Sequence, residues 1–347
     1  MAPRLGLGGG VTANPASGLF ASTPLLLDTY PNAHRAYSVR KLRTDYTGYA
    51  MKVRNDDDET ADIAFNDNGI VAGDSPTANL SGGSGATLDA FVTGATGSAN
   101  EGYVDTWYDQ SGEGSNATSN APGEQPRIYD GGSLVTSGSG GTVNTAVKFV
   151  TDSDVADTSF LQVSNSGLSI GNVSVFWVSK VDLALSYGAA PIGSTWWLSD
   201  GSTEYCGHLL YSSGDEIFYS NLGLGSIKTG PHEDTTNPDP PYPGGPFAGG
   251  GPSAAFDYLD IPRIFSFNAS TSSQTISHNG TAGSHSGSSA NSVSFAGTAS
   301  NQGIGHHSLG GNYSHNGPIQ EFIVYDSNQS SNDSGIVANI NAAFNHF

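Results

Sequence analysis

The sequence contains a single cysteine, Cys206, among its 347 residues. A disulfide within the chain is therefore excluded, and the fold has to be stabilised by its core. No partner base can be placed beside this thiol from the sequence, so an idle or buried cysteine is favoured over a reactive one.

Long apolar runs are also missing. The first twenty residues carry one arginine but no continuous apolar stretch, and "PLLLDTY" (24–30) is far too short to span a bilayer. The sequence therefore predicts neither a conventional secretory protein nor a membrane protein.

Basic residues are scarce: 12 Lys and Arg stand against 32 Asp and Glu, which gives a formal net charge of −20. Such a charge repels phosphate groups, so nucleic acid and anionic membranes are excluded as expected partners. The same charge keeps a multi-copy protein soluble, and it is compatible with carbohydrate binders and with proteins on the outside of a capsid.

Good helix formers are few, whereas Gly, Ser, Thr and Asn are abundant and Tyr, Phe, Val and Ile recur in short runs. This predicts an all-β fold, a two-sheet antiparallel sandwich forming one domain over residues 35–347. The expected strands are residues 37–43, 49–55, 101–109, 145–150, 159–163, 171–182, 216–223, 263–270, 273–280, 291–297 and 317–326.

Three segments depart from the strand pattern. Residues 66–86 and the Pro/Gly-rich residues 229–255 are expected to be long loops. At the C-terminus, apolar residues three or four positions apart follow a Ser/Asn/Asp cluster and predict a short closing helix: Ile336, Ile340, Phe344 and Phe347.

Residues 1–34 are rich in Gly and Pro and hold few large apolar side chains, so we expect an extended N-terminal arm that cannot fold alone. The arm is either disordered or laid against another subunit. Its glycines would let it follow another backbone closely. The residues expected to anchor it are Arg4, Leu5, Leu7, Leu19 and Phe20.

Trp196 and Trp197 are adjacent, so on a strand their rings would point to opposite faces and only one could enter the core. An outward indole near Tyr205 could stack on a sugar ring, which makes Trp196, Trp197 and Tyr205 the candidate carbohydrate-binding residues. An intersubunit contact and ordinary packing remain the alternatives.

No cofactor is expected. The run Asp56–Glu59 has enough oxygen atoms for Ca²⁺, but consecutive residues cannot all face one ion, and a solvated turn is favoured. Asp152, Asp154 and Asp157 alternate, yet they also favour a loop. The histidines between 278 and 315 follow no metal-binding spacing.

Half of the basic residues lie within positions 35–54, next to the acidic run "NDDDE". We expect them to pair across neighbouring strands with Asp45, Asp56 and Asp58. The six residues are Arg35, Arg40, Lys41, Arg43, Lys52 and Arg54.

Two stretches together are specific: "AYSVRKLRTDYTGYAMKVRNDDDETADIAF" (36–65) and "WYDQSGEGSNATSNAPGEQPRI" (107–128). They resemble the N-terminal half of the catalytic domain of arabinofuranosidase B-type glycoside hydrolases, in which "YTG", "DIAF" and "YDQSG" elements recur. They also resemble a module of virion structural proteins from tailed, often marine, bacteriophages. Both resemblances imply a concanavalin A-like, laminin-G-like jelly-roll sandwich.

The end of the chain, with Gly317, Ile319, Glu321, Tyr325 and Asp326 in a "G-x-I-x-E-x-x-x-Y-D" pattern, resembles the last strands and terminal helix of the phage examples. The opening "MAPRLGLGGG" resembles the leader of such virion proteins. The resemblance covers roughly residues 36–150 and 260–347.

A glycoside hydrolase needs two carboxylates at a fixed separation. The family's adjacent cysteine pair is absent, and Leu209 and Leu210 stand where its glutamate is expected after "GH". Glu204, Asp215 and Glu216 are the nearest carboxylates but match no motif, so no catalytic residue is assigned.

These observations predict a non-enzymatic structural protein on the exterior of a tailed-phage virion, as a capsid decoration, fibre or tail appendage. It would be present in many copies or as a homo-oligomer and bound to other virion subunits, with host-surface glycans as a further expected contact. The alternatives are an arabinofuranosidase-like glycoside hydrolase or depolymerase, and a free carbohydrate-binding module.

Overall fold

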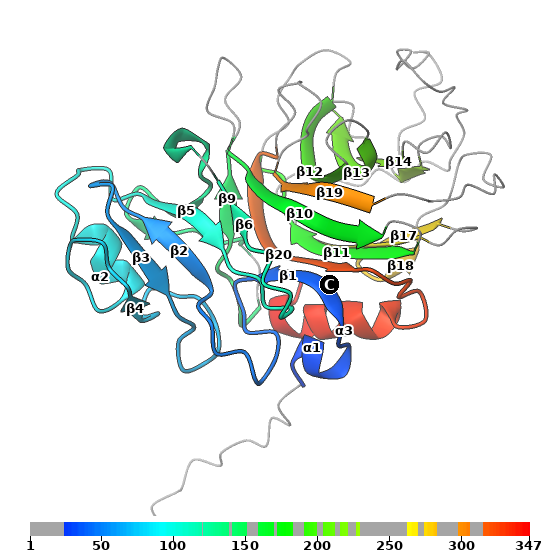
Figure 1. Cartoon of the computed structure of the whole chain (residues 1–347), viewed down its shortest axis with the longest axis horizontal. Coiled ribbons are helices and arrows are strands. Elements are labelled where there is room, and N and C mark those ends of the chain that lie inside the picture. The colour runs from blue at the N-terminus through cyan, green and yellow to red at the C-terminus, as the bar shows by residue number, and fades with distance from the viewer. Residues whose placement is uncertain are drawn as a thin grey trace, which may run out of the picture.

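A computed structural model of the chain (Figure 1) describes residues 24–119, 121–138, 141–150, 159–169, 172–182, 191–199, 204–211, 216–220, 227–229, 262–269, 274–282, 298–305 and 315–347. The predicted anchoring residues Arg4, Leu5, Leu7, Leu19 and Phe20, and all of the 229–255 loop after Thr229, lie outside these ranges.

The described strands form one continuous, curled antiparallel sheet, which confirms the all-β prediction. We divide it into three sections. The central section contains β1 (Ala33–Ser38), β20 (Gly317–Tyr325), β11 (Val173–Ser179), β16 (Arg263–Ala269), β17 (Gln274–His278) and β18 (Thr281–Ala282). The facing section contains β6 (Ala117–Thr118), β10 (Leu161–Ser169), β19 (Thr298–Ile304), β12 (Pro191–Ser199), β13 (Glu204–Tyr211), β14 (Glu216–Ser220) and β15 (Ile227–Thr229).

The lateral section contains β2 (Met51–Arg54), β3 (Thr60–Ile63), β4 (Thr77–Ala78), β5 (Gly102–Trp107), β7 (Arg127–Asp130), β8 (Ser133–Leu134) and β9 (Val147–Phe149). It joins the central section where β9 pairs with β20, and the facing section through β5, β6 and β10. Predicted strand 291–297 lies outside the described residues, while β19 begins at Thr298.

Helices are few and short: α1 (Leu26–Thr29), α2 (Leu88–Thr93), the 3₁₀ turn η1 (Pro122–Glu124) and α3 (Asp333–Phe344). The predicted C-terminal helix is confirmed as α3, in which Ile336, Ile340 and Phe344 are fully buried. Phe347 is 55% exposed, so its predicted place on the apolar face is wrong. The helix ends before it because Asn345 adopts a left-handed conformation (φ 53°).

The central and facing sections enclose an aromatic core. Trp177 of β11 stacks on Phe265 of β16 with ring centroids 4.9 Å apart, and the Trp177 indole meets Trp196 of β12 edge-on at 5.6 Å. Both tryptophans are fully buried. Because aromatic side chains bury more area than any others, this pair is the main apolar link between the two sections.

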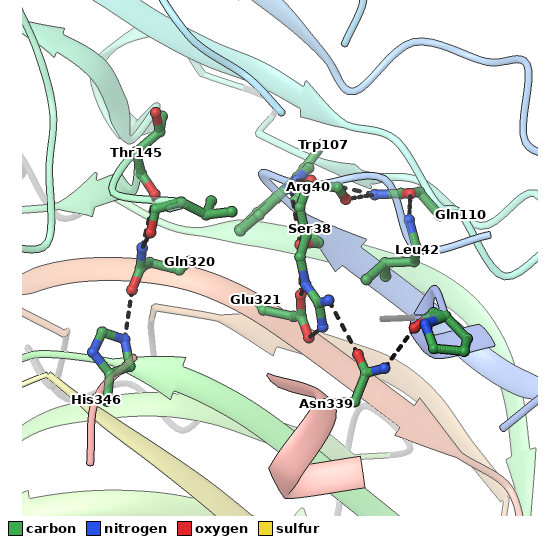
Figure 2. A network of polar contacts seen from close by, with 12 residues as sticks. Ser38, Arg40, Leu42, Trp107, Gln110, Thr145, Gln320, Glu321, Asn339 and His346 are labelled. Atoms are coloured by element: carbon green, nitrogen blue, oxygen red, sulfur yellow. Dashed lines mark hydrogen bonds and ion pairs between the residues drawn. The ribbon is translucent and has the colours of Figure 1, made fainter. Parts of the chain in front are cut away.

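A second layer lies between the central section and α3, and it contains a buried ion pair (Figure 2). Arg40 donates from Nε to Glu321 Oε2 (2.8 Å) and from Nη2 to Glu321 Oε1 (3.0 Å), and its Nη1 donates to Asn339 of α3 (3.1 Å). Glu321 is fully buried and Arg40 is 7% exposed. The hydroxyl of Ser38 also donates to Glu321 (2.7 Å), so the carboxylate is surrounded by donors.

The N-terminal boundary of the folded domain lies earlier than predicted. Leu26 is fully buried and Leu27 nearly so, and β1 starts at Ala33, paired with β20. The Pro24 carbonyl accepts a hydrogen bond from Asn339 Nδ2 (2.7 Å). Residues 24–34 are therefore part of the fold rather than of the arm, because they supply apolar side chains and a central strand.

The cluster of basic residues divides into two groups. Arg43 pairs with Asp45 and Arg54 with Asp58, but these partners are two and four residues along the chain, so the predicted pairing across neighbouring strands is wrong for both. Arg40 instead enters the interior, so its predicted surface pairing is wrong. Asp56 was also expected to take a basic partner, but its Oδ2 accepts from the backbone N–H of Glu101 (3.2 Å).

A buried histidine, His315, and a half-buried one, His346, make stability depend on pH. Burial lowers the pKa of His315 to about 4 and that of His346 to about 4, whereas an unfolded histidine titrates near pH ~6.5. The unfolded chain therefore binds more protons between these values. The free energy of unfolding therefore has its full value from these two groups above pH ~6.5, where both are neutral, and it decreases as the pH falls towards 4.

We expect the free energy of unfolding to fall between pH 7 and pH 5 with a slope of up to about 1.4 kcal/mol per pH unit for each histidine. Urea unfolding at a series of pH values measures this slope. His346→Gln should make it shallower while leaving the slope from pH 7 to 8 unchanged. Equal slopes in the two proteins would contradict the assignment.

Candidate functional site

The structure separates the two candidate tryptophans as their adjacency predicts. Trp196 is fully buried, with ring centroids 6.1 Å from Phe267 and 6.2 Å from Phe322. Its predicted role as a sugar platform is therefore wrong, because its register position faces the core.

Trp197 occupies the opposite face of β12, which is the outer face of the facing section, and is 6% exposed. A Cβ atom added to Gly303 of β19 would lie 1.9 Å from the indole Nε1. Only glycine lets the indole approach the backbone of β19 so closely. The carbohydrate-binding role of Trp197 stays a prediction.

Tyr205 is the extra residue of a β-bulge in β13. Leu198 pairs with Cys206 and Ser199 with Glu204, so Tyr205 has no partner position on β12. Bulges of this kind re-aim neighbouring side chains and are frequent beside functional sites.

The register defines a row of residues across the outer face, one position from each strand. Residues directly opposite one another in a ladder share a face of the sheet. The row containing Trp197 is Thr118, Gln162, Gly303, Trp197, Gly207 and Tyr219.

A second row on the same face lies two residues further along β10, β19 and β12. It consists of Ser164, Asn301, Ser199 and Glu204. We call the two rows together the outer face. They combine aromatic residues, glycines, hydroxyls, amides and one carboxylate, which are the groups that polar ligands with apolar flanks require.

Glu204 and Glu216 cannot serve one site. Glu216 pairs with Leu210, six residues along β13 from Glu204, and six residues of strand span about 20 Å. Tyr219 of β14 lies opposite Gly207, which pairs with Trp197, and Glu216 is three residues from Tyr219 on the same strand. Because side chains alternate along a strand, Glu216 belongs to the opposite face of the sheet. Asp215 lies outside the described residues. Of the three carboxylates, the register places Glu204 on the outer face.

The carboxylates of Asp56–Glu59 point to different donors. Asp57 accepts from Thr96 and Gly97, whereas Asp58 pairs with Arg54. Within the described ranges no group of three potential metal-ligating side chains occurs. Asp152, Asp154 and Asp157 lie in a part of the chain that the structure does not describe.

Sequence reasoning missed a second cluster, which the structure assembles from the motif stretches. Tyr46 and Tyr49 of "YTGY", Phe65 of "DIAF" and Tyr108 of "YDQSG" lie together and are all half-buried. We call these four residues the tyrosine cluster. The signal that could have found it is the recurrence of aromatic residues in the three most specific motifs.

No protein-family model and no curated protein sequence matches the chain. Among solved structures, an arabinofuranosidase complexed with arabinofuranosyl-α-1,2-xylobiose is similar over 92% of this chain and 64% of its own, with a TM-score of 0.50 and 14% identity. A Trypanosoma rangeli sialidase (TM-score 0.42, 11% identity) is matched over 68% of this chain and 30% of its own. The receptor-binding domain of botulinum neurotoxin D (TM-score 0.43, 9% identity) is matched over 67% and 50%.

The arabinofuranosidase likeness corrects the prediction that the chain is not an enzyme. That prediction depended on a missing cysteine pair and a missing glutamate motif. Catalysis by two carboxylates requires a scaffold that holds them, not a particular flanking sequence. The scaffold is shared with an arabinofuranosidase over nearly the whole chain. The fold of this protein is thus similar to one that carries glycoside hydrolase chemistry.

Proposed function

We propose that the protein is a glycoside hydrolase that acts on arabinofuranosyl or related pentosyl groups, with the sugar bound on the outer face. The observation that supports this most is the shared arabinofuranosidase fold together with Glu204 on the same face as Trp197. We also infer that the curled sheet is a two-sheet, concanavalin A-like jelly roll.

The outer face offers the two kinds of contact that a pentosyl group needs. Tyr219 and Trp197 are aromatic residues in one row, and aromatic residues are frequent partners of the apolar faces of sugar rings. Ser164, Ser199 and Asn301 occupy the next row, and residues of these types hydrogen-bond sugar hydroxyls.

Hydrolysis needs a second carboxylate, about 5–5.5 Å from the first for retention or about 6.5–9.5 Å for inversion. We assign the first to Glu204. Asp200 is the nearest carboxylate along the chain, since it directly follows Ser199. In such a pair one carboxyl group protonates the leaving oxygen while the other attacks the anomeric carbon or activates a water.

We expect hydrolysis of a chromogenic α-L-arabinofuranoside that falls by at least about 100-fold in Glu204→Gln, because general acid–base catalysis typically contributes 10²–10⁴-fold. Release of the chromophore measures it. Glu216→Gln is the matched control: it removes an identical carboxylate on the next strand, about 20 Å away, and should retain full activity.

Equal activity in Glu204→Gln and the unaltered protein would contradict the site. Sugar binding without turnover in the unaltered protein would favour the carbohydrate-binding module instead. Loss of hydrolytic activity in Glu216→Gln alone would place the catalytic carboxylate on the other face of the sheet, at Glu216.

Placement on a virion is a separate proposal that the sequence resemblance alone supports. In this proposal the protein lies on the particle exterior in several copies, bound to other virion subunits. A hydrolase in that position would meet the glycans of a host surface.

A further inference from the structure

The tyrosine cluster lies at one end of three neighbouring strands of the lateral section. Met51 starts β2 and pairs with Ile63 at the end of β3 and with Trp107 at the end of β5. The residues just beyond these strand ends are therefore neighbours, although they are up to 62 positions apart in the sequence.

The four rings form two contacting pairs. Tyr46 and Phe65 meet edge-on with centroids 6.3 Å apart, and Tyr49 and Tyr108 are tilted at 46° with centroids 6.4 Å apart. The Tyr46 hydroxyl donates to the backbone carbonyl of Tyr49 (2.8 Å), which joins the two pairs. All four side chains remain half-buried, so the cluster has both a packed side and a solvent-facing side.

A polar group lies beneath the rings. Asp62 is 6% exposed and accepts from the Tyr108 hydroxyl at Oδ1 (2.6 Å) and from Asn79 Nδ2 at Oδ2 (2.7 Å). Burial, with Asp62 as the hydrogen-bond acceptor, raises the pKa of Tyr108 well above its usual value. Burial, followed by the charge of Asp109, raises the pKa of Tyr46 to about 12. Both phenols are therefore neutral donors at physiological pH.

The glycine of the "YTG" motif makes the cluster possible. A Cβ atom on Gly48 would lie 2.6 Å from the Tyr46 hydroxyl and 2.7 Å from the adjacent ring carbon. A side chain there would push the Tyr46 ring away from Tyr49. Gly48 of the "YTG" motif therefore determines where the Tyr46 ring lies.

We propose that the tyrosine cluster is a second carbohydrate-binding site, for neutral polysaccharide chains, separate from the outer face. Half-exposed aromatic rings offer flat apolar surface to the C–H faces of sugars, and the phenolic oxygens of the tyrosines can accept hydrogen bonds from sugar hydroxyls. Figure 1 shows β2, β3 and β5 at one end of the molecule and β12–β14 at the other.

Charge selects neutral chains over anionic ones. The carboxylates of Asp62, Asp109 and Asp45 lie at or beside the cluster. Two cations lie beside these carboxylates: Arg43 is bound to Asp45 through both Nε and Nη2, and Lys52 is directly opposite Asp62 in the β2–β3 ladder. A uronate or sulfate would meet net negative charge there.

Affinity electrophoresis in gels containing arabinoxylan tests the proposal, with polygalacturonate as the anionic probe. The Glu204→Gln background prevents turnover, so the result does not depend on the proposed hydrolase. We expect arabinoxylan to retard the protein, polygalacturonate to have no effect, and Tyr49→Ala to weaken the arabinoxylan affinity about tenfold.

Tyr103→Ala is the matched control. Tyr103 is also a half-buried tyrosine, but it lies between Arg54 (4.4 Å) and Arg127 (5.7 Å), away from the cluster. Its loss should leave retardation unchanged. Tyr46→Ala serves as the second cluster variant if Tyr49→Ala unfolds, as judged by thermal melting.

Three outcomes would overturn the proposal: no retardation by arabinoxylan, equal retardation of the cluster variants and their parent, or an equal loss in Tyr103→Ala. Retardation by polygalacturonate alone would also overturn it. Hydrolytic activity with no retardation would refute this site and leave the proposed function intact.

Discussion

Replacing Arg40 by methionine is expected to lower the free energy of unfolding by about 3–5 kcal/mol, the usual cost of breaking a buried ion pair from one side. Glu321 has no exposed surface and would keep its charge without a counterion. The change also removes the hydrogen bond to Asn339 of α3 and the contact with the Phe344 ring (5.5 Å). Urea unfolding with linear extrapolation measures the loss.

Two controls separate this effect from a general loss of charge. Arg43→Met removes an exposed ion pair with Asp45 and should cost at most about 1 kcal/mol. The double variant Arg40→Met/Glu321→Leu leaves no buried charge and should recover much of the lost stability. A loss in Arg40→Met no larger than in Arg43→Met would show that Glu321 finds another partner or a proton.

Trp196→Ala is expected to lower the free energy of unfolding by about 3–5 kcal/mol, because it leaves a cavity between the central and facing sections. The indole contacts Trp177, Phe267 and Phe322, so the residues around the cavity come from three strands and cannot close in easily. Calorimetry or urea unfolding measures the change.

Trp197→Ala is the neighbouring control. Its ring lies on Gly303 and is 6% exposed, whereas Trp196 is fully buried, and we expect a smaller loss of stability. Under the proposed function it should instead weaken sugar binding. A larger loss of stability in Trp197→Ala than in Trp196→Ala would contradict the placement of the two rings.

Local patterns predicted much of the fold. The alternation around Val53 and the spacing of Ile336, Ile340 and Phe344 each report a period that the structure keeps. The strand expected over residues 37–43 is wrong: β1 ends at Ser38, and residues 35–40 are all buried rather than alternating. The adjacency of Trp196 and Trp197 also predicted their opposite faces, since the period of a strand is two.

Pairing between distant segments could not be predicted. Glu321 is 281 positions from Arg40, and nothing near either residue indicates the other. The short β3, β7 and β8 were not among the expected strands, and neither were the longer β12 and β13. The outer face likewise depends on register, because a slip of one residue would exchange Trp197 for Trp196.

The same limit explains the correction about enzymatic activity. A sequence motif identifies a glutamate only when it follows a familiar short sequence. Catalysis depends instead on which carboxylates lie on the same face of the sheet. Glu204 matches no motif, yet the bulge at Tyr205 places it opposite Ser199, two residues from Trp197.

The hydrogen bond from Asn339 to the Pro24 carbonyl has a consequence for attachment. It fixes the start of the described chain beside α3, the helix that leads to the C-terminus at Phe347 (Figure 1). This helix packs on β16, on the side of the central section that faces away from β12 and β19. A support or fusion partner joined through Phe347 would therefore lie on the α3 side of the central section, away from the facing section that holds Trp197 and Glu204.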